Sequence, residues 1–191
     1  MIGRTVDQLA IGDAAELSRR VTQADIVGFT YSVGDRNPVH FDPAFAATTP
    51  FRGPIAPGLW TAGLISGVIG TRLPGPGTIY ETQGLRFLRP VKPGDTITAR
   101  VEVAELLPER NRVRLKTTCL NQRGEEVLSG EAWVLPPKSA IHYAEERPAI
   151  ASLASWPLRP LAAAARALSF WWMLGACTLA VTASPIGCER P

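Results

Sequence analysis

Period-two alternation of apolar and polar residues runs through much of the chain. In residues 95–106, for example, Ile97 and Val101 alternate with Thr98 and Arg100. We predict strands at 14–21, 78–88, 95–106, 112–120 and 125–135. Alternation of this kind places one face of each strand in the core and the other in water, which is typical of antiparallel sheets.

Three other segments follow helical patterns. Thr22 and Asp25 resemble a capping box ahead of a short helix over 25–33, and Asp42-Pro43 is typical of the start of a second helix through 44–47. Residues 58–70 are apolar on nearly every side, so we expect the rest of the domain to bury this helix, which is too short to span a membrane. One buried helix against a curved antiparallel sheet is an α+β architecture.

The alternating pattern ends near Pro136-Pro137, which we predict to be a domain boundary. Residues 1–137 then form the folded domain, and residues 138–191 form a C-terminal extension without a recognisable domain pattern. Within the extension, residues 167–183 are uncharged and rich in large apolar side chains. We favour a loosely docked extension. A membrane-associating segment and a helix packed on the domain or a partner subunit are the less favoured alternatives.

Composition and charge restrict the classes of function. With 46% hydrophobic and 19% charged residues, the chain has material for a packed core and does not resemble a disordered protein. The formal net charge is +3 without a basic stripe, so no nucleic-acid partner is indicated. The three cysteines, Cys119, Cys177 and Cys188, fit neither a disulfide framework nor a zinc site. The N-terminal segment has no apolar signal core, and we expect a cytoplasmic protein.

The turn from Gly34 to His40 carries the residues best suited to chemistry. Gly34 and Asn37-Pro38 are turn formers, and a turn here can bring Asp35 and His40 to one side of a small pocket. A carboxylate near an imidazole can hold a water molecule and draw off its proton. The alternative is that Asp35 caps the turn and His40 is bonded to a backbone carbonyl. Spacing alone favours this structural role.

A resemblance to a known family favours the catalytic role of Asp35 and His40 over the structural one. The run from Ser32 to Pro43, SVGDRNPVHFDP, resembles the hydratase-2 motif of MaoC-like dehydratases and (R)-specific enoyl-CoA hydratases. Further similar stretches follow in the same order at 55–70, 73–80, 85–95, 119–122 and 130–132, so that the resemblance covers roughly residues 8–136. It implies a hot-dog fold, in which the sheet wraps the apolar helix, and a homodimer. It also implies an acyl-CoA thioester substrate.

The same resemblance implies roles for individual residues. Asp35 and His40 would activate the water that adds to a trans-2-enoyl-CoA, giving the (R)-3-hydroxyacyl product. The backbone N–H of Gly58, at the start of the apolar helix, would stabilise the thioester oxygen as enolate charge develops. Asn37, Ser66 and Trp60 are candidate substrate-binding residues. For Ser66 a hydroxyl bonded to the preceding turn is an equal alternative, and Trp60 is favoured as core or acyl-pocket wall.

No metal or redox cofactor is expected, because the sequence shows neither a ligand cluster nor a phosphate-binding glycine loop. Arg52, Arg86, Arg89 and Lys92 are candidates for coenzyme A phosphate contacts, although solvated surface charge is the favoured interpretation of each.

One departure from the family pattern concerns the start of the apolar helix. Family members commonly have His-Gly-Met there, whereas this chain has Pro57-Gly58-Leu59. Pro57 supplies neither that side chain nor an N–H, and it either rigidifies the loop or displaces the Gly58 donor. Two other functions stay open. An acyl-CoA thioesterase would use the same fold. A non-catalytic acyl-CoA-binding subunit is suggested by Pro57 and by the unusual C-terminal extension.

Overall fold

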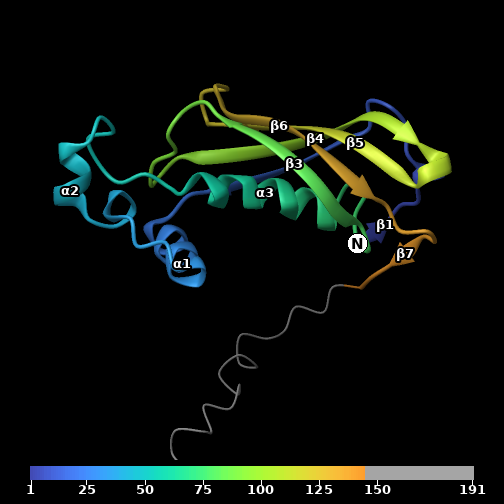
Figure 1. The fold of residues 1–191 in the computed structure, drawn as a ribbon, viewed down its shortest axis with the longest axis horizontal. Helices are drawn as coiled ribbons and strands as arrows, with labels where there is room; N and C mark the ends of the chain where they lie inside the picture. The colour runs from blue at the N-terminus through green and yellow to red at the C-terminus, as the bar shows by residue number, and fades with distance from the viewer. Residues whose placement is uncertain (145–191) are drawn as a thin grey trace, which may run out of the picture. The chain divides into compact units, whose positions relative to one another are not determined.

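A curved antiparallel sheet lies against one long helix, α3 (Gly58–Thr71), in the computed structural model, which describes residues 1–144 (Figure 1). The sheet has five strands in the order β2-β4-β5-β6-β3, with every neighbouring pair antiparallel. Their bounds are β2 Ala14–Arg20, β3 Ile79–Phe87, β4 Thr96–Leu107, β5 Arg112–Leu120 and β6 Glu126–Leu135. The predicted strands and the α+β hot-dog fold are confirmed.

The core lies between the concave face of the sheet and one face of α3. Alternate residues of β4 and β5 point inward and are almost fully buried, as the period-two pattern requires. Helix α3 contributes Trp60, Leu64, Ile65, Val68 and Ile69 to the same cluster.

The prediction that α3 is buried on all sides is wrong for the single chain. A sheet covers a helix from one direction only, so the opposite face of α3 stays open. That open face carries Leu59, which is 61% exposed, together with Gly63, Ser66 and Gly70.

Helices α1 (Gln23–Val33) and α2 (Pro43–Thr48) lie together at one end of the sheet (Figure 1). The predicted capping box is confirmed: Thr22 Oγ1 accepts a hydrogen bond from the Asp25 N–H at 3.1 Å, and the Asp25 carboxylate accepts from the Thr22 N–H at 3.0 Å. Hydrogen bonding from the Thr22 side chain lowers the pKa of Asp25. The predicted Asp42 cap of α2 is also present, accepting from the Phe45 N–H at 3.0 Å.

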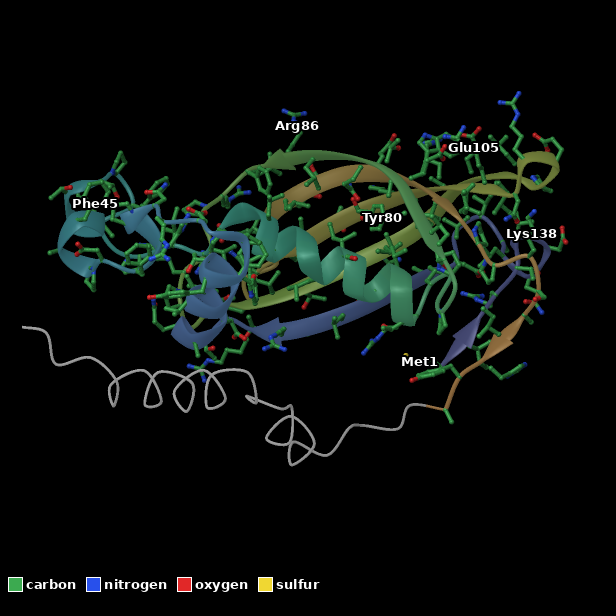
Figure 2. The ribbon with its side chains drawn as sticks, turned by 60° about the horizontal axis from the view of Figure 1, so that its bottom comes forward. Met1, Phe45, Tyr80, Arg86, Glu105 and Lys138 are labelled. Atoms are coloured by element: carbon green, nitrogen blue, oxygen red, sulfur yellow. The ribbon has the colours of Figure 1, made fainter. Side chains whose placement is uncertain are left out.

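A small second sheet pairs the start of the domain with residues beyond Pro137. Strands β1 (Ile2–Gly3) and β7 (Ile141–His142) are antiparallel, at the end of the molecule where Figure 2 labels Met1 and Lys138. The Met1 ammonium also donates to the Tyr143 carbonyl at 2.6 Å. Residues 141–142, which follow the domain boundary predicted at 137, therefore pair with the first strand of the domain.

No helix within residues 1–144 is long and apolar enough to cross a membrane. The apolar segment 167–183, on which the membrane alternative rests, lies outside the described residues, as do Cys177 and Cys188.

Candidate active site

The turn after α1 fixes the position of Asp35. Gly34 ends the helix in the left-handed conformation, with φ of 74°, which glycine adopts without strain. The Asp35 N–H donates to the Thr30 carbonyl at 2.9 Å. Asp35 Oδ1 accepts from the Asn37 N–H at 3.0 Å, so that one carboxylate oxygen belongs to the turn and the other, Oδ2, stays available.

Asn37 connects this carboxylate to the short 3₁₀ helix η2 (Pro38–His40), which carries the histidine. Its side chain caps η2 by accepting from the Val39 N–H at 3.3 Å, and its carbonyl accepts from the His40 N–H at 3.2 Å. Asn37, a candidate substrate-binding residue from the sequence, thus holds the turn that joins Asp35 to His40.

The turn brings Asp35 and His40 together. Asp35 Oδ2 lies 3.5 Å from His40 Nε2, and the two side chains are 34% and 10% exposed. On its other side, His40 Nδ1 lies 2.8 Å from the Ile55 carbonyl oxygen. Because a carbonyl only accepts hydrogen bonds, Nδ1 carries the proton, and in the neutral ring Nε2 presents its lone pair to the carboxylate.

Two acceptors therefore face each other across 3.5 Å. A water molecule can satisfy both, since it can donate one hydrogen to Asp35 Oδ2 and the other to His40 Nε2. The hydrogen bonds of the structural alternative are present, since Asp35 accepts within the turn and His40 is bonded to a backbone carbonyl, and the latter bond leaves the second His40 nitrogen facing Asp35.

The segment after Ile55 links this pair to the start of α3. The Ile55 N–H donates to the Val39 carbonyl at 3.3 Å, and the Ala56 N–H donates to the Val91 carbonyl at 2.7 Å. Pro57 occupies the N-cap position of α3 and, as a proline, offers no capping oxygen. The helix nonetheless begins at Gly58, and among residues 1–144 no acceptor is paired with the Gly58 N–H.

Gly58 lines an apolar pocket of about 430 Å³. Its walls come from the start of α3, the segment before it, the end of β3 with the residues that follow, and β6; they include Leu59, Phe87, Val91 and Val127. The Phe87 ring lies against Gly58, where a Cβ atom would come within 2.6 Å of ring atom Cε1. A helix N-terminus that opens into an apolar pocket is suited to binding a developing negative charge.

A second, smaller pocket of about 50 Å³ lies beside Asp35. It is lined by Thr30, Tyr31, Arg36 and Phe41 as well, and the Arg36 guanidinium stacks on the Tyr31 ring at 5.2 Å from its centroid. In the single chain, Asp35 and Gly58 thus line different pockets.

The remaining candidate residues lie outside the turn that carries Asp35 and His40. Trp60 is 9% exposed and belongs to the core cluster, as favoured from the sequence. Ser66 lies on the open face of α3. Figure 2 shows Arg86 projecting from β3 away from α3, so it does not reach the pocket that Gly58 lines.

Of the other cations, Arg89 lines the larger pocket and donates to the Glu126 carbonyl at 2.6 Å. Lys92 Nζ donates to the Phe51 carbonyl at 2.9 Å. Arg52 is exposed and holds a left-handed φ of 53°.

Two residues of the site were not identified from the sequence. Ile55 orients His40 through its backbone carbonyl, which no side-chain pattern signals. Phe87 ends an edge strand, and its contact with Gly58 depends on how β3 lies beside α3. Within residues 1–144 no cluster of His, Cys, Asp or Glu is arranged to hold a metal ion.

Comparison with known proteins agrees with this architecture. The family model described as "MaoC like domain" matches residues 8–123. The chain is 52% identical over 132 residues to a 3-hydroxybutyryl-CoA dehydratase of Methylorubrum extorquens, a match that covers 69% of this chain and 83% of the relative. It is 43% identical over 133 residues to an (R)-specific enoyl-CoA hydratase of Aeromonas caviae, covering 70% of this chain and 99% of the relative.

Among solved structures, the unliganded R-hydratase PhaJ1 from Pseudomonas aeruginosa superimposes with a TM-score of 0.70 at 45% identity, covering 77% of this chain and 96% of that chain. The fold, the motif-bearing turn and the family match all coincide over the same part of the sequence. The chain belongs to the MaoC-like domain family.

Proposed function

We propose that this protein is an (R)-specific 2-enoyl-CoA hydratase, a hydro-lyase that reversibly converts trans-2-enoyl-CoA to (R)-3-hydroxyacyl-CoA. The observation that carries the proposal is the pair of acceptors, Asp35 Oδ2 and His40 Nε2, facing each other at 3.5 Å. Relatives named as hydratase and as dehydratase catalyse the two directions of one such reaction.

In the hydration direction, Asp35 and His40 hold one water molecule between them. The water oxygen forms a bond to Cβ of the enoyl thioester while one of its protons passes to the acid–imidazole pair. The pair returns one proton to Cα on the same face, so the elements of one water molecule are added across the double bond. The addition is therefore syn, and the face of the double bond that the water attacks sets the (R) configuration at Cβ.

The Gly58 N–H stabilises the intermediate by donating to the thioester oxygen, on which enolate charge develops. The α3 N-terminus supports this role, because its unpaired N–H groups and helix dipole favour negative charge. Pro57 is compatible with it, since the helix still begins at Gly58. Arg89, at the larger pocket, is the cation best placed for a coenzyme A phosphate.

We further propose that the protein is a homodimer that functions in the cytoplasm. Strand β3 is a free sheet edge, and exposed unpaired edges are commonly covered in native proteins. Ile79 and Phe87, at its two ends, are 60% and 54% exposed. Analytical ultracentrifugation tests the dimer, and sedimentation as a monomer at micromolar concentration would refute it.

The function is tested with crotonyl-CoA, the four-carbon substrate suggested by the relative named a 3-hydroxybutyryl-CoA dehydratase. The purified protein is expected to remove the absorbance of the conjugated enoyl thioester and to yield the (R)-alcohol on chiral analysis. Release of free thiol from saturated butyryl-CoA would instead identify a thioesterase. Tight binding of crotonyl-CoA without turnover would identify a non-catalytic acyl-CoA-binding subunit.

A further inference from the structure

The Phe87 ring lies against the first residue of α3, in the space that a side chain at position 58 would take. An ideal Cβ on Gly58 would lie 2.6, 2.9 and 3.0 Å from ring atoms Cε1, Cδ1 and Cζ of Phe87. Gly58 has helical backbone geometry that any residue can adopt, so conformational freedom is not the reason for glycine here. The ring occupies the space that a side chain would take.

Phe87 reaches this position from the edge strand. It is the last residue of β3 and pairs with Leu128, which is fully buried, so the Phe87 side chain leaves the strand on the side that faces α3. The residue is nevertheless 54% exposed. Its ring therefore contributes little to the core and instead forms part of the wall of the 430 Å³ pocket that Gly58 also lines.

An apolar ring at a helix N-terminus affects how a carbonyl group can approach it. An apolar ring beside a helix N-terminus excludes water from that side, and a hydrogen bond to a charged oxygen is stronger where water is excluded. The ring also restricts the directions from which a thioester oxygen can reach that N–H.

We infer that Phe87 is a positioning residue of the reaction, whose ring holds the substrate's thioester carbonyl against the Gly58 N–H. This inference rests on the proposed hydratase function. It assigns Phe87 a role in kcat as well as in binding, because the hydrogen bond that it directs is strongest when the enolate forms.

The first test compares Phe87→Ala and Phe87→Leu with the full-length wild type on crotonyl-CoA. Phe87→Ala is expected to lower kcat/KM by roughly ten- to a hundredfold, with part of the loss in kcat, as for a misplaced reacting group. Phe87→Leu keeps an apolar wall and is expected to recover most of the activity. Ile11→Ala, which removes an exposed apolar side chain outside both β3 and the pocket lining, is the control and is expected to stay near wild type.

The second test is a double-mutant cycle with Gly58→Ala. Alone, the added methyl meets the Phe87 ring and is expected to reduce activity. In the Phe87→Ala background the methyl has space and the backbone N–H is retained, so Gly58→Ala is expected to cost little more. If the double variant instead loses kcat/KM by the product of the two single losses, the two substitutions act independently and the inference is overturned.

The outcomes separate the inference from the proposed function. If wild type hydrates crotonyl-CoA and Phe87→Ala matches it in both kcat and KM, the inference alone is refuted. If wild type does not hydrate enoyl-CoA substrates at all, the proposed function and the inference fail together. Thermal unfolding of each variant shows that it is folded, and Phe87→Leu provides the decisive comparison should Phe87→Ala not fold.

Discussion

His40 Nε2 lies 3.5 Å from Asp35 Oδ2, and in the neutral ring it presents its lone pair there because Nδ1 donates to the Ile55 carbonyl. The separation is too long for a direct hydrogen bond and suits a shared water molecule. This geometry is the basis for the proposed role of the pair in hydration.

Replacement of either member of this pair tests its catalytic role. Asp35→Asn keeps an oxygen for the Asn37 N–H but removes the charge that faces His40, and we expect kcat for crotonyl-CoA to fall by about a hundredfold or more. His40→Ala is expected to fall at least as far. It also leaves the Ile55 carbonyl without its partner, at a cost of about 1–3 kcal/mol in the free energy of unfolding.

Asp35→Asn is accordingly the cleaner variant, and its unfolding temperature should stay close to that of wild type. Full activity in both variants would remove Asp35 and His40 from the mechanism.

Asn37→Ala tests whether the turn positions the pair. The change removes the side-chain oxygen that caps η2 while keeping the backbone N–H that donates to Asp35. We expect a loss of about 1 kcal/mol in stability, typical of a lost helix cap, and a lower kcat with little change in KM. Asn37→Ser, which can also cap, should restore both. A large rise in KM at unchanged kcat would instead favour direct substrate binding by Asn37.

Tyr80 gives the protein a distinctive response to alkaline pH. Its hydroxyl donates to Gln83 Oε1 at 2.6 Å, the Gln83 amide donates to Thr117 Oγ1 at 3.2 Å, and burial raises the pKa of Tyr80 to about 12. In the unfolded chain the phenol ionises near its ordinary pKa of about 10, whereas in the folded protein it keeps its proton to higher pH. Stability that depends on the neutral phenol is therefore complete below pH 10 and is lost as the pH rises towards 12.

Urea unfolding of wild type and Tyr80→Phe between pH 8 and pH 12 measures this effect. Wild type should lose stability relative to Tyr80→Phe above pH 10, since phenylalanine cannot ionise. A constant difference between the two proteins across this range would contradict the prediction.

Cys119 should be chemically inert in the folded protein. It is fully buried, its thiol donates to the Thr61 carbonyl at 3.8 Å, and burial raises its pKa to about 12, so that almost no thiolate forms at neutral pH. Iodoacetamide at pH 8 is expected to leave Cys119 unmodified in native protein and to alkylate it in urea, as read by peptide mass mapping. Rapid native labelling at Cys119 would show that the core opens readily.

Much of the fold is determined by local patterns in the sequence. Alternation in β4 and β5 specifies which side chains enter the core, because each strand residue can face only one side. Thr22 with Asp25 and Asp42 with Pro43 specify where α1 and α2 begin, since these caps use atoms within a few residues of one another. The spacing of Asp35 and His40 by itself favours a structural role, and the resemblance to the hydratase-2 motif identifies them as a catalytic pair; one short, continuous segment builds their contact.

What only the tertiary structure decided involves partners far apart in the chain. Strand β7 is too short to show a period and exists because β1 pairs with it. The Ile55 carbonyl that sets the His40 tautomer and the Phe87 ring that lies against Gly58 leave no local signature. A sequence displays the preferences of each segment, whereas close approach between segments depends on how the sheet curves around α3, which is fixed only when the whole core packs.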